Sequence, residues 1–134
     1  KRVRQLAEFE NFRKRSEKEK SQMFEMGAKN VVEKMLPVID NFERGLLAVA
    51  EEDKESPFVQ GMELVYKQML TAFDALGVKP IEAIGKPFNT EEFEAIATIP
   101  APEPDMKGKV LDCVQTGYTL FDKVIRHAKV VVGE

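Results

Sequence analysis

The spacing of apolar side chains predicts a long, thin helix over residues 1–35. This stretch contains no proline, a single glycine and mostly helix-forming residues. Leu6, Phe9 and Phe12 follow a three-residue spacing, whereas residues 13–22 carry no apolar side chain at all. A helix this polar has little to bury and is marginal alone. We therefore expect it to pair loosely with a second helix, most simply its own copy, through a seam that includes Leu6 and Phe9.

A wider apolar stripe follows in the stretch Leu36–Leu47. The apolar side chains that recur there every four residues, on one face of a helix, are Val38, Phe42 and Leu46. Pro37 lacks an amide proton, so it either opens a helix at its first turn or kinks one that is already running. We interpret the stretch as the start of a packed helical body. Its stripe should be core, while Arg44 points outward.

A second amphipathic helix follows the acidic connector at residues 51–55. Ser56 and Pro57 form a typical helix start, because a hydroxyl caps the first turn and proline suits the first helical position. Gly77 is a typical helix stop. The apolar face between them, at spacings of three and four, is Phe58, Met62, Val65, Met69, Phe73 and Leu76. Two such helices cannot complete a core alone, so two copies forming a four-helix bundle are the economical solution.

From Val78 onward the pattern changes to short β-prone runs separated by proline and glycine. The runs are residues 78–81, 96–99, 110–114 and 129–132. Residues 89–92 resemble a helix start and predict about one helical turn through Phe93 and Ile96. The predicted fold class is α+β, with a helical dimerisation region at 1–77 and a small, mainly antiparallel β domain at 78–134.

Charge is distributed unevenly along the chain. Residues 1–20 hold eight Lys and Arg against four Asp and Glu, whereas residues 21–55 hold four against eight. A basic tip on an acidic body favours a negatively charged partner, either a protein or a nucleic acid. One hypothesis is therefore a coiled-coil dimer that binds nucleic acid through its N-terminal helix. Glu17 and Glu19 dilute the positive field of that helix.

Candidate catalytic chemistry is sparse. One Cys and one His exclude a zinc cluster within the chain, and the isolated glycines indicate turns rather than a phosphate loop. The sharpest catalytic hypothesis is a thiol enzyme that pairs Cys113 with His127. However, a cysteine inside a strand is usually an inert small residue, and His127 lies in a basic run typical of a surface. We therefore predict no enzyme activity, no cofactor and no metal.

No apolar run reaches the roughly 18 residues that a membrane span requires, so no membrane partner is expected. A single cysteine fits a reducing compartment. These observations predict a cytoplasmic protein. An organellar matrix or stroma stays open, because Lys1 is not a natural start and a targeting segment can be missing.

Four ordered motifs over nearly the whole chain resemble the GrpE family. They are residues 7–15 (AEFENFRKR), residues 36–44 (LPVIDNFER), residues 61–64 (GMEL), and residues 117–120 (GYTL) followed by 124–130 (VIRHAKV). Members of that family are nucleotide exchange factors of DnaK-type chaperones. The resemblance implies a homodimer with paired long helices, a central four-helix bundle and a β domain from each subunit.

The resemblance also implies an activity. The protein would grip the chaperone's ATPase domain and favour an open nucleotide cleft, so that ADP leaves, and no chemical bond would be made or broken. Partners would be that ATPase domain and a second copy of the chain, without nucleic acid. Melting of the long helices on heating would damp the exchange.

Individual residues carry the family's roles by position. Those implied to contact the chaperone are Arg13, Lys14, Arg44, Gly61, Phe88, Val114 and Val132. Those implied in dimerisation are Leu6, Phe9, Val38, Phe42, Leu46, Met62, Met69 and Phe73. The chain departs from the family pattern at Gln22, Thr90 and Phe93, which affects individual side-chain contacts rather than the mode of binding. Val114 and Val132 could equally be buried strand residues.

Overall fold

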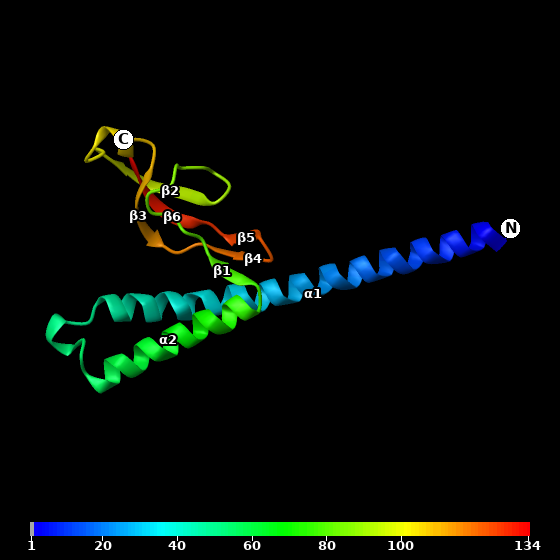
Figure 1. Cartoon of the computed structure of the whole chain (residues 1–134), viewed down its shortest axis with the longest axis horizontal. Helices are drawn as coiled ribbons and strands as arrows, with labels where there is room; N and C mark the ends of the chain where they lie inside the picture. Colours follow the sequence, from blue (N-terminus) through cyan, green and yellow to red (C-terminus); the bar gives the residue numbers. More distant parts are fainter. Residues whose placement is uncertain (1) are drawn as a thin grey trace. The chain divides into compact units, whose positions relative to one another are not determined.

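A computed structural model describes residues 2–134 and confirms the α+β class (Figure 1). Two α-helices come first, α1 (Arg2–Leu47) and α2 (Pro57–Ala75), with a 3-10 turn at Glu51–Asp53 between them. The strands that follow are β1 (Val78–Pro80), β2 (Phe93–Ile99), β3 (Val110–Gln115), β4 (Tyr118–Leu120), β5 (Lys123–Arg126) and β6 (Ala128–Gly133). A second 3-10 turn, Pro104–Met106, precedes β3.

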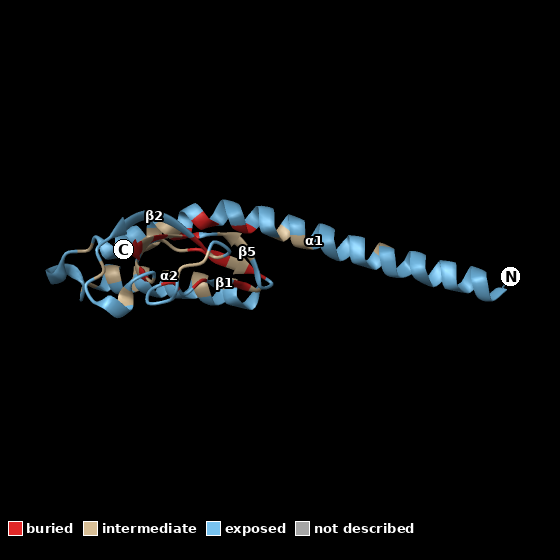
Figure 2. Cartoon of the chain, turned by 90° about the horizontal axis from the view of Figure 1, so that it is seen from above, coloured by how far each residue is buried: buried red, intermediate tan, exposed pale blue. Residues whose placement is uncertain are grey.

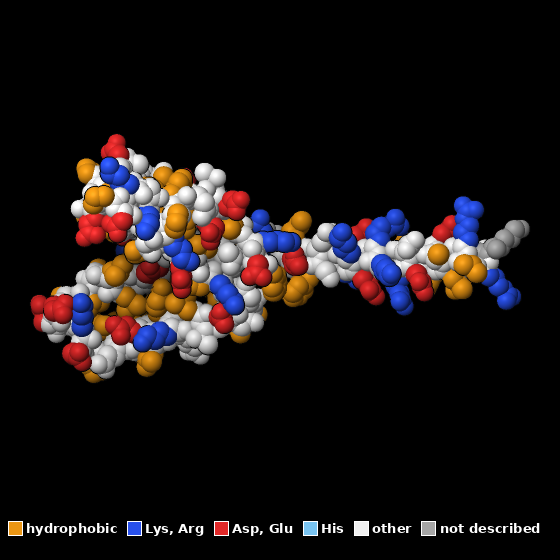
Figure 3. Space-filling view, turned by 45° about the horizontal axis from the view of Figure 1, so that its top comes forward, with side chains coloured by type: hydrophobic (Ala, Val, Ile, Leu, Met, Phe, Trp, Pro, Cys, Tyr) orange, Lys and Arg blue, Asp and Glu red, His pale blue; other side chains and the backbone are white. Residues whose placement is uncertain are grey.

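The chain divides into two compact units, one ending at Met35 and the other spanning Leu36–Glu134. The first unit contains only the N-terminal part of α1, whose surface is almost entirely exposed (Figure 2). Leu6 and Phe9 are 64% and 66% exposed. Side chains of both charge signs alternate along this segment (Figure 3). A helix with so little buried surface within its own chain matches the thin seam that its sequence predicts.

Pro37 lies inside α1, which is assigned as one helix of 46 residues. The alternative in which Pro37 opens a new helix is therefore wrong. A proline inside a helix leaves the carbonyl four residues earlier, here that of Glu33, without its amide partner. Both residues are exposed, so water can satisfy that carbonyl.

Beyond Met35, α1 presents two apolar faces with different surroundings. Leu36 and Ile39 are buried, at 2% and 0% exposure. Val38 is 43% exposed, and Phe42 and Leu46 are only half-buried. The stripe that the sequence singles out is therefore still partly open in the single chain.

Both ends of α2 form as the sequence predicts. The hydroxyl oxygen of Ser56 accepts a hydrogen bond from the amide of Val59 at 3.2 Å, and Pro57 occupies the first turn. At the other end Gly77 adopts a φ of +88°, the left-handed conformation that closes a helix. No residue of α2 is fully buried, so most of its apolar face has no cover in the single chain.

The strands form two three-stranded sheets. The first has the order β1-β4-β5 and is antiparallel throughout. The second has the order β2-β6-β3, in which β6 runs parallel to β2 and antiparallel to β3. The prediction of a mainly antiparallel β domain is confirmed, and the parallel β2–β6 pair is an addition to it.

The helical turn predicted through Phe93 and Ile96 is wrong, because both residues belong to strand β2. The start signal itself forms: the Asn89 side chain accepts a hydrogen bond from the Glu92 amide at 2.8 Å. The chain then continues as a strand rather than a helix, since β2 pairs along its length with β6. Tertiary pairing overrides the local preference.

The main core of the β region lies between the second sheet and the loops beside it. Its buried members are Ile81, Ala83, Phe93, Val110, Ala128, Val130 and Val132. Tyr118 and Leu120 of β4 are buried as well, at 1% and 4% exposure. Within residues 2–134, no helix has the length and apolar character needed to cross a membrane.

Candidate partner-binding surface

The guanidinium of Arg126, at the end of β5, joins the β region to helix α1. Its two terminal nitrogens lie 2.6 and 2.7 Å from the two carboxylate oxygens of Asp40, which is a bidentate ion pair. Nε also donates to the carbonyl of Thr116 at 3.1 Å, and the guanidinium carbon lies 5.3 Å from the centroid of the Tyr118 ring. Both side chains of the pair are largely buried, at 21% and 13% exposure.

Glu43 extends this contact by one helical turn. Its two carboxylate oxygens lie 3.4 Å from the hydroxyl of Thr116, which can donate to either. Burial, followed by the negative charge of Glu43, raises the pKa of Tyr66. The pKa of Tyr118 is raised as well, chiefly by burial. Helix α1 and the β region therefore meet at one junction, which consists of Asp40, Glu43, Thr116, Tyr118 and Arg126. Tyr66 of α2 lies close enough for the charge of Glu43 to raise its pKa.

A polar cleft of about 140 Å³ lies beside the junction. Its walls come from α1 and from β3 with the turn that follows, and its lining residues are Asp40, Glu43, Arg44, Leu47, Cys113, Val114, Gln115 and Thr116. Arg44 is exposed and Val114 is 60% exposed. Two of the residues predicted to contact a partner, far apart in the sequence, therefore line the same cleft.

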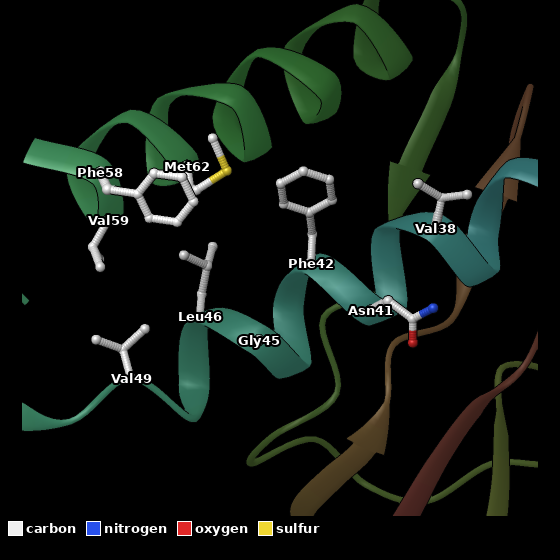
Figure 4. Close-up of a pocket in the computed structure, with 9 residues that line it drawn as sticks. All are labelled: Val38, Asn41, Phe42, Gly45, Leu46, Val49, Phe58, Val59 and Met62. Carbon is white, nitrogen blue, oxygen red and sulfur yellow. The ribbon is translucent and has the colours of Figure 1, made fainter.

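An apolar cavity of about 440 Å³ opens between α1 and α2. Phe42 and Leu46 project from α1 toward Met62 on α2 (Figure 4). The complete lining is Val38, Asn41, Phe42, Gly45, Leu46, Val49, Phe58, Val59 and Met62. Four of the predicted dimerisation residues therefore share one open cavity, and Figure 3 shows the apolar side chains gathered over these two helices.

A third hollow, of about 470 Å³, lies on the β region. Its lining is Phe88, Thr90, Phe93, Glu94, Ala95 and His127. The rings of Phe88 and Phe93 lie 6.4 Å apart in a tilted arrangement. Phe93 is buried to 2% exposure, so it supports this hollow from beneath, whereas Phe88 is only half-buried and can be reached from outside.

The remaining predicted contact residues lie in different surroundings. Arg13 and Lys14 are exposed on the N-terminal part of α1. Gly61 lies in α2, with open space where a side chain would project. Val132 belongs to the core at 8% exposure, unlike Val114. A contact from Val132 would therefore need the β region to open, whereas Val114 is already accessible.

No sequence pattern indicates that Asp40, Thr116 and Arg126 belong to one junction. Asp40 and Arg126 are 86 positions apart, and neither forms a local pattern with the other. The motifs quoted above do contain both residues, but they carry no information on which side chains meet.

The geometry offers no support for catalysis by Cys113. The thiol is half-buried and lies 3.4 Å from the carbonyl of Gln115, to which it can donate. Burial, followed by the negative charges of Glu43 and Asp112, raises its pKa, whereas a nucleophilic cysteine needs a lowered one. Cys113 and His127 line different hollows. Among residues 2–134, no group of three acidic, His or Cys side chains is arranged to hold a metal ion.

The sequence model of the GrpE family matches residues 1–134, the full chain. The chain belongs to the GrpE family. A GrpE protein of Parabacteroides distasonis is 60% identical over 132 residues, which cover 98% of this chain and 68% of that protein. GrpE of Bacteroides thetaiotaomicron is 49% identical over 132 residues, which again cover 98% of this chain and 68% of that protein. GrpE of Chlorobaculum tepidum is 41% identical over 138 residues, covering 98% of this chain and 70% of that protein.

Membership of the GrpE family makes the chain a nucleotide exchange factor, a co-chaperone of the DnaK system. The role consists of binding and releasing a partner rather than catalysis in the usual sense. Partnership with a DnaK-type chaperone and dimerisation are general properties of the family. The alternative of a nucleic-acid-binding coiled coil has no support from the relatives.

Proposed function

We propose that this chain acts as a homodimer that binds the ATPase domain of a DnaK-type chaperone, holds its nucleotide cleft open and so releases ADP. The observation that carries the proposal is the cleft where Arg44 of α1 and Val114 of β3 lie together. It offers a guanidinium and an apolar group to one partner surface, and arginine is among the residues that are enriched at protein interfaces. No bond is made or broken, so the exchange factor is not an enzyme.

The free-energy argument for nucleotide release is one of differential binding. A partner that binds the open ATPase domain more tightly than the closed, nucleotide-filled one shifts the equilibrium toward the open state. Binding is reciprocal: the exchange factor weakens the chaperone's affinity for nucleotide by some factor, and bound nucleotide weakens its affinity for the exchange factor by the same factor. We propose Arg44, Gly61, Phe88 and Val114 as contact positions, with Arg13 and Lys14 on the long helix, and Val132 as support from the core.

Dimerisation is supported by the open apolar cavity between α1 and α2. A hollow of about 440 Å³ lined by Phe42, Leu46 and Met62 exposes apolar area that favours burial by a partner. Helices from a second copy would cover it and complete a four-helix core, which includes Val38, Met69 and Phe73. Leu6 and Phe9 would pair the long helices. The chain is expected to work in the cytoplasm.

The direct test follows the release of a fluorescent ADP analogue from a DnaK-type chaperone as this protein is added. Acceleration that saturates with concentration is expected. No acceleration at saturating concentration would overturn the proposal. Arg44→Ala and Val114→Asp should each raise the concentration needed for half-maximal acceleration. Glu82→Gln, which changes an exposed carboxylate away from the cleft, serves as the matched control.

Dimerisation has its own test. Sedimentation equilibrium should give twice the mass of the chain, and Phe42→Asp should shift the protein toward the monomer by placing a charge in the apolar cavity. Gln60→Asp is the control, since it adds the same charge to an exposed polar residue of α2 that does not line the cavity. A wild-type monomer at micromolar concentration would contradict the dimer.

A further inference from the structure

The contact between α1 and the β region rests on two kinds of interaction. On the same stretch of α1, Leu36 and Ile39 are buried at 2% and 0% exposure, and burial of apolar surface is stabilising but not directional. The Asp40–Arg126 pair supplies two parallel hydrogen bonds at 2.6 and 2.7 Å, whose planar geometry fixes direction as well as distance.

The other polar contacts of Asp40 and Glu43 at this junction are longer. The Thr116 hydroxyl lies 3.4 Å from Glu43, and the Gln115 amide lies 3.5 Å from Asp40. Arg126 also holds the turn after β3, because its guanidinium donates to the Thr116 carbonyl from two nitrogens. A single side chain therefore ties this turn and the end of β5 to one position on α1.

The Asp40–Arg126 pair also affects the relative position of two residues that are proposed to bind the chaperone. Arg44 lies one helical turn beyond Asp40 on α1, so the two share a face of the helix. Val114 lies two residues before Thr116, the residue whose carbonyl Arg126 holds. Arg44 and Val114 line one cleft, and their separation depends on the angle between α1 and the β region.

We propose that Asp40 and Arg126 are positioning residues for nucleotide exchange: their bidentate pair fixes the angle at which Arg44 and Val114 reach the chaperone together. This inference rests on the proposed function. Partly buried ion pairs often add little net stability, because desolvation offsets their attraction. The pair acts instead by narrowing the orientations that the β region samples before the chaperone binds, which lowers the ordering cost of binding.

A double-mutant cycle tests whether the two residues act as a pair. The variants are Asp40→Asn, Arg126→Gln and the double variant, with Glu82→Gln as the control because it removes one carboxylate from an exposed ion pair. Each single variant should raise the half-saturating concentration for ADP-analogue release about tenfold, and the double variant should be no worse than either. Additive losses would overturn the pairing.

Arg126→Lys separates positioning from simple loss of charge, since lysine keeps the charge but not the planar fork. Spin labels at Ala48→Cys, directly after the end of α1, and at Thr98→Cys on β2, in a Cys113→Ala background, report the angle between α1 and the β region in the free protein. Labelled chains are mixed with excess unlabelled chains, so that few dimers carry two labelled subunits. Arg126→Lys should broaden the distance distribution and weaken chaperone binding, while the maximal release rate at saturation stays near that of wild type.

The outcomes separate the two proposals. A wild-type chain that does not release nucleotide refutes the proposed function. If the wild-type chain does release nucleotide, the Arg126→Lys variant tests the positioning role alone. An unchanged distance distribution or an unchanged half-saturating concentration in that variant refutes the positioning role. Melting curves for each variant show whether it is folded at the assay temperature. If Asp40→Asn fails to fold, Arg126→Lys decides the question by itself.

Discussion

The ring of Phe121 lies against Gly77, at the point where α2 ends and β1 is about to begin. The Phe121 amide donates to the Gly77 carbonyl at 3.0 Å. A methyl group on Gly77 would approach ring carbon Cε1 to 2.6 Å, which is closer than two carbon atoms can pack. The β4–β5 hairpin is thereby fastened to the end of α2 through a contact that only glycine permits.

Gly77→Ala should therefore destabilise the fold for two reasons. Gly77 has a φ of +88°, which costs a residue with a β-carbon about 1–2 kcal/mol, and the clash with Phe121 adds to that cost. Gly85→Ala is the matched control, because Gly85 has a φ of +84° but open space around it. Urea unfolding should show a larger loss of unfolding free energy for Gly77→Ala. Equal losses would mean that the Phe121 contact contributes nothing.

Two glycine substitutions in the turn between β4 and β5 should change stability in opposite directions. Phe121 and Asp122 both have positive φ, at 49° and 66°. Asp122→Gly should relieve backbone strain and raise stability by about 0.5 kcal/mol, since the Asp122 side chain is exposed. Phe121→Gly relieves the same strain but removes the ring from Gly77, so it should lower the denaturation midpoint. A destabilising Asp122→Gly would show that the aspartate side chain itself holds the turn.

These local features show what the sequence can predict. Ser56, Pro57 and Gly77 act within one helical turn of themselves, so the ends of α2 follow directly from them. Phe121 and Asp122 lack the asparagine–glycine pair typical of a tight hairpin turn, and a single aspartate is too weak a signal to predict the turn they form. One contact of that turn, between Phe121 and Gly77, joins residues that are distant in the sequence.

The junction could not be predicted for a related reason. The Asp40–Arg126 pair is an interaction over 86 positions, and charged residues are too common in this chain for any one pair to stand out. At Phe93 the prediction failed for a different reason: a local signal was present, but a non-local contact overrode it. The local signal was correct, because Asn89 does cap the turn, but pairing of β2 with β6 decided the structure that followed. Sequence patterns predicted the helices and four of the strands but missed β4 and β5, and non-local contacts placed the site.

Stability should fall at alkaline pH because of buried tyrosines. Burial, followed by the nearby Tyr66 and Glu43, raises the pKa of Tyr118, so the folded state favours the neutral phenol. A group whose pKa is higher in the folded state stabilises fully below its unfolded pKa, near 10.0, and loses that contribution as pH rises. The denaturation midpoint should therefore decline above pH 10. Tyr118→Phe cannot ionise and should decline less steeply; an identical decline would contradict the assignment.

The N-terminal part of α1 should melt before the rest of the protein. Leu6 and Phe9 are largely exposed in the single chain, and residues 13–22 add no apolar contact, so its pairing in a dimer is thin. Circular dichroism on heating should show a first, reversible loss of helix followed by cooperative unfolding of the remainder. Exchange activity should drop across the first transition, because Arg13 and Lys14 lie on the melting segment. A single cooperative transition would count against this form of thermal regulation.

Gly61 offers a test of chaperone contact that spares the fold. A β-carbon at this position meets nothing within 4 Å, so a larger residue fits the isolated chain. Gly61→Ala should stabilise α2, because alanine exceeds glycine in helix propensity by about 1 kcal/mol, and its binding should change little. Gly61→Asp adds bulk and a charge on the same helix face, so it should weaken chaperone binding while the circular dichroism spectrum stays unchanged. Binding by Gly61→Asp as tight as that of Gly61→Ala would place the chaperone contact elsewhere on the surface.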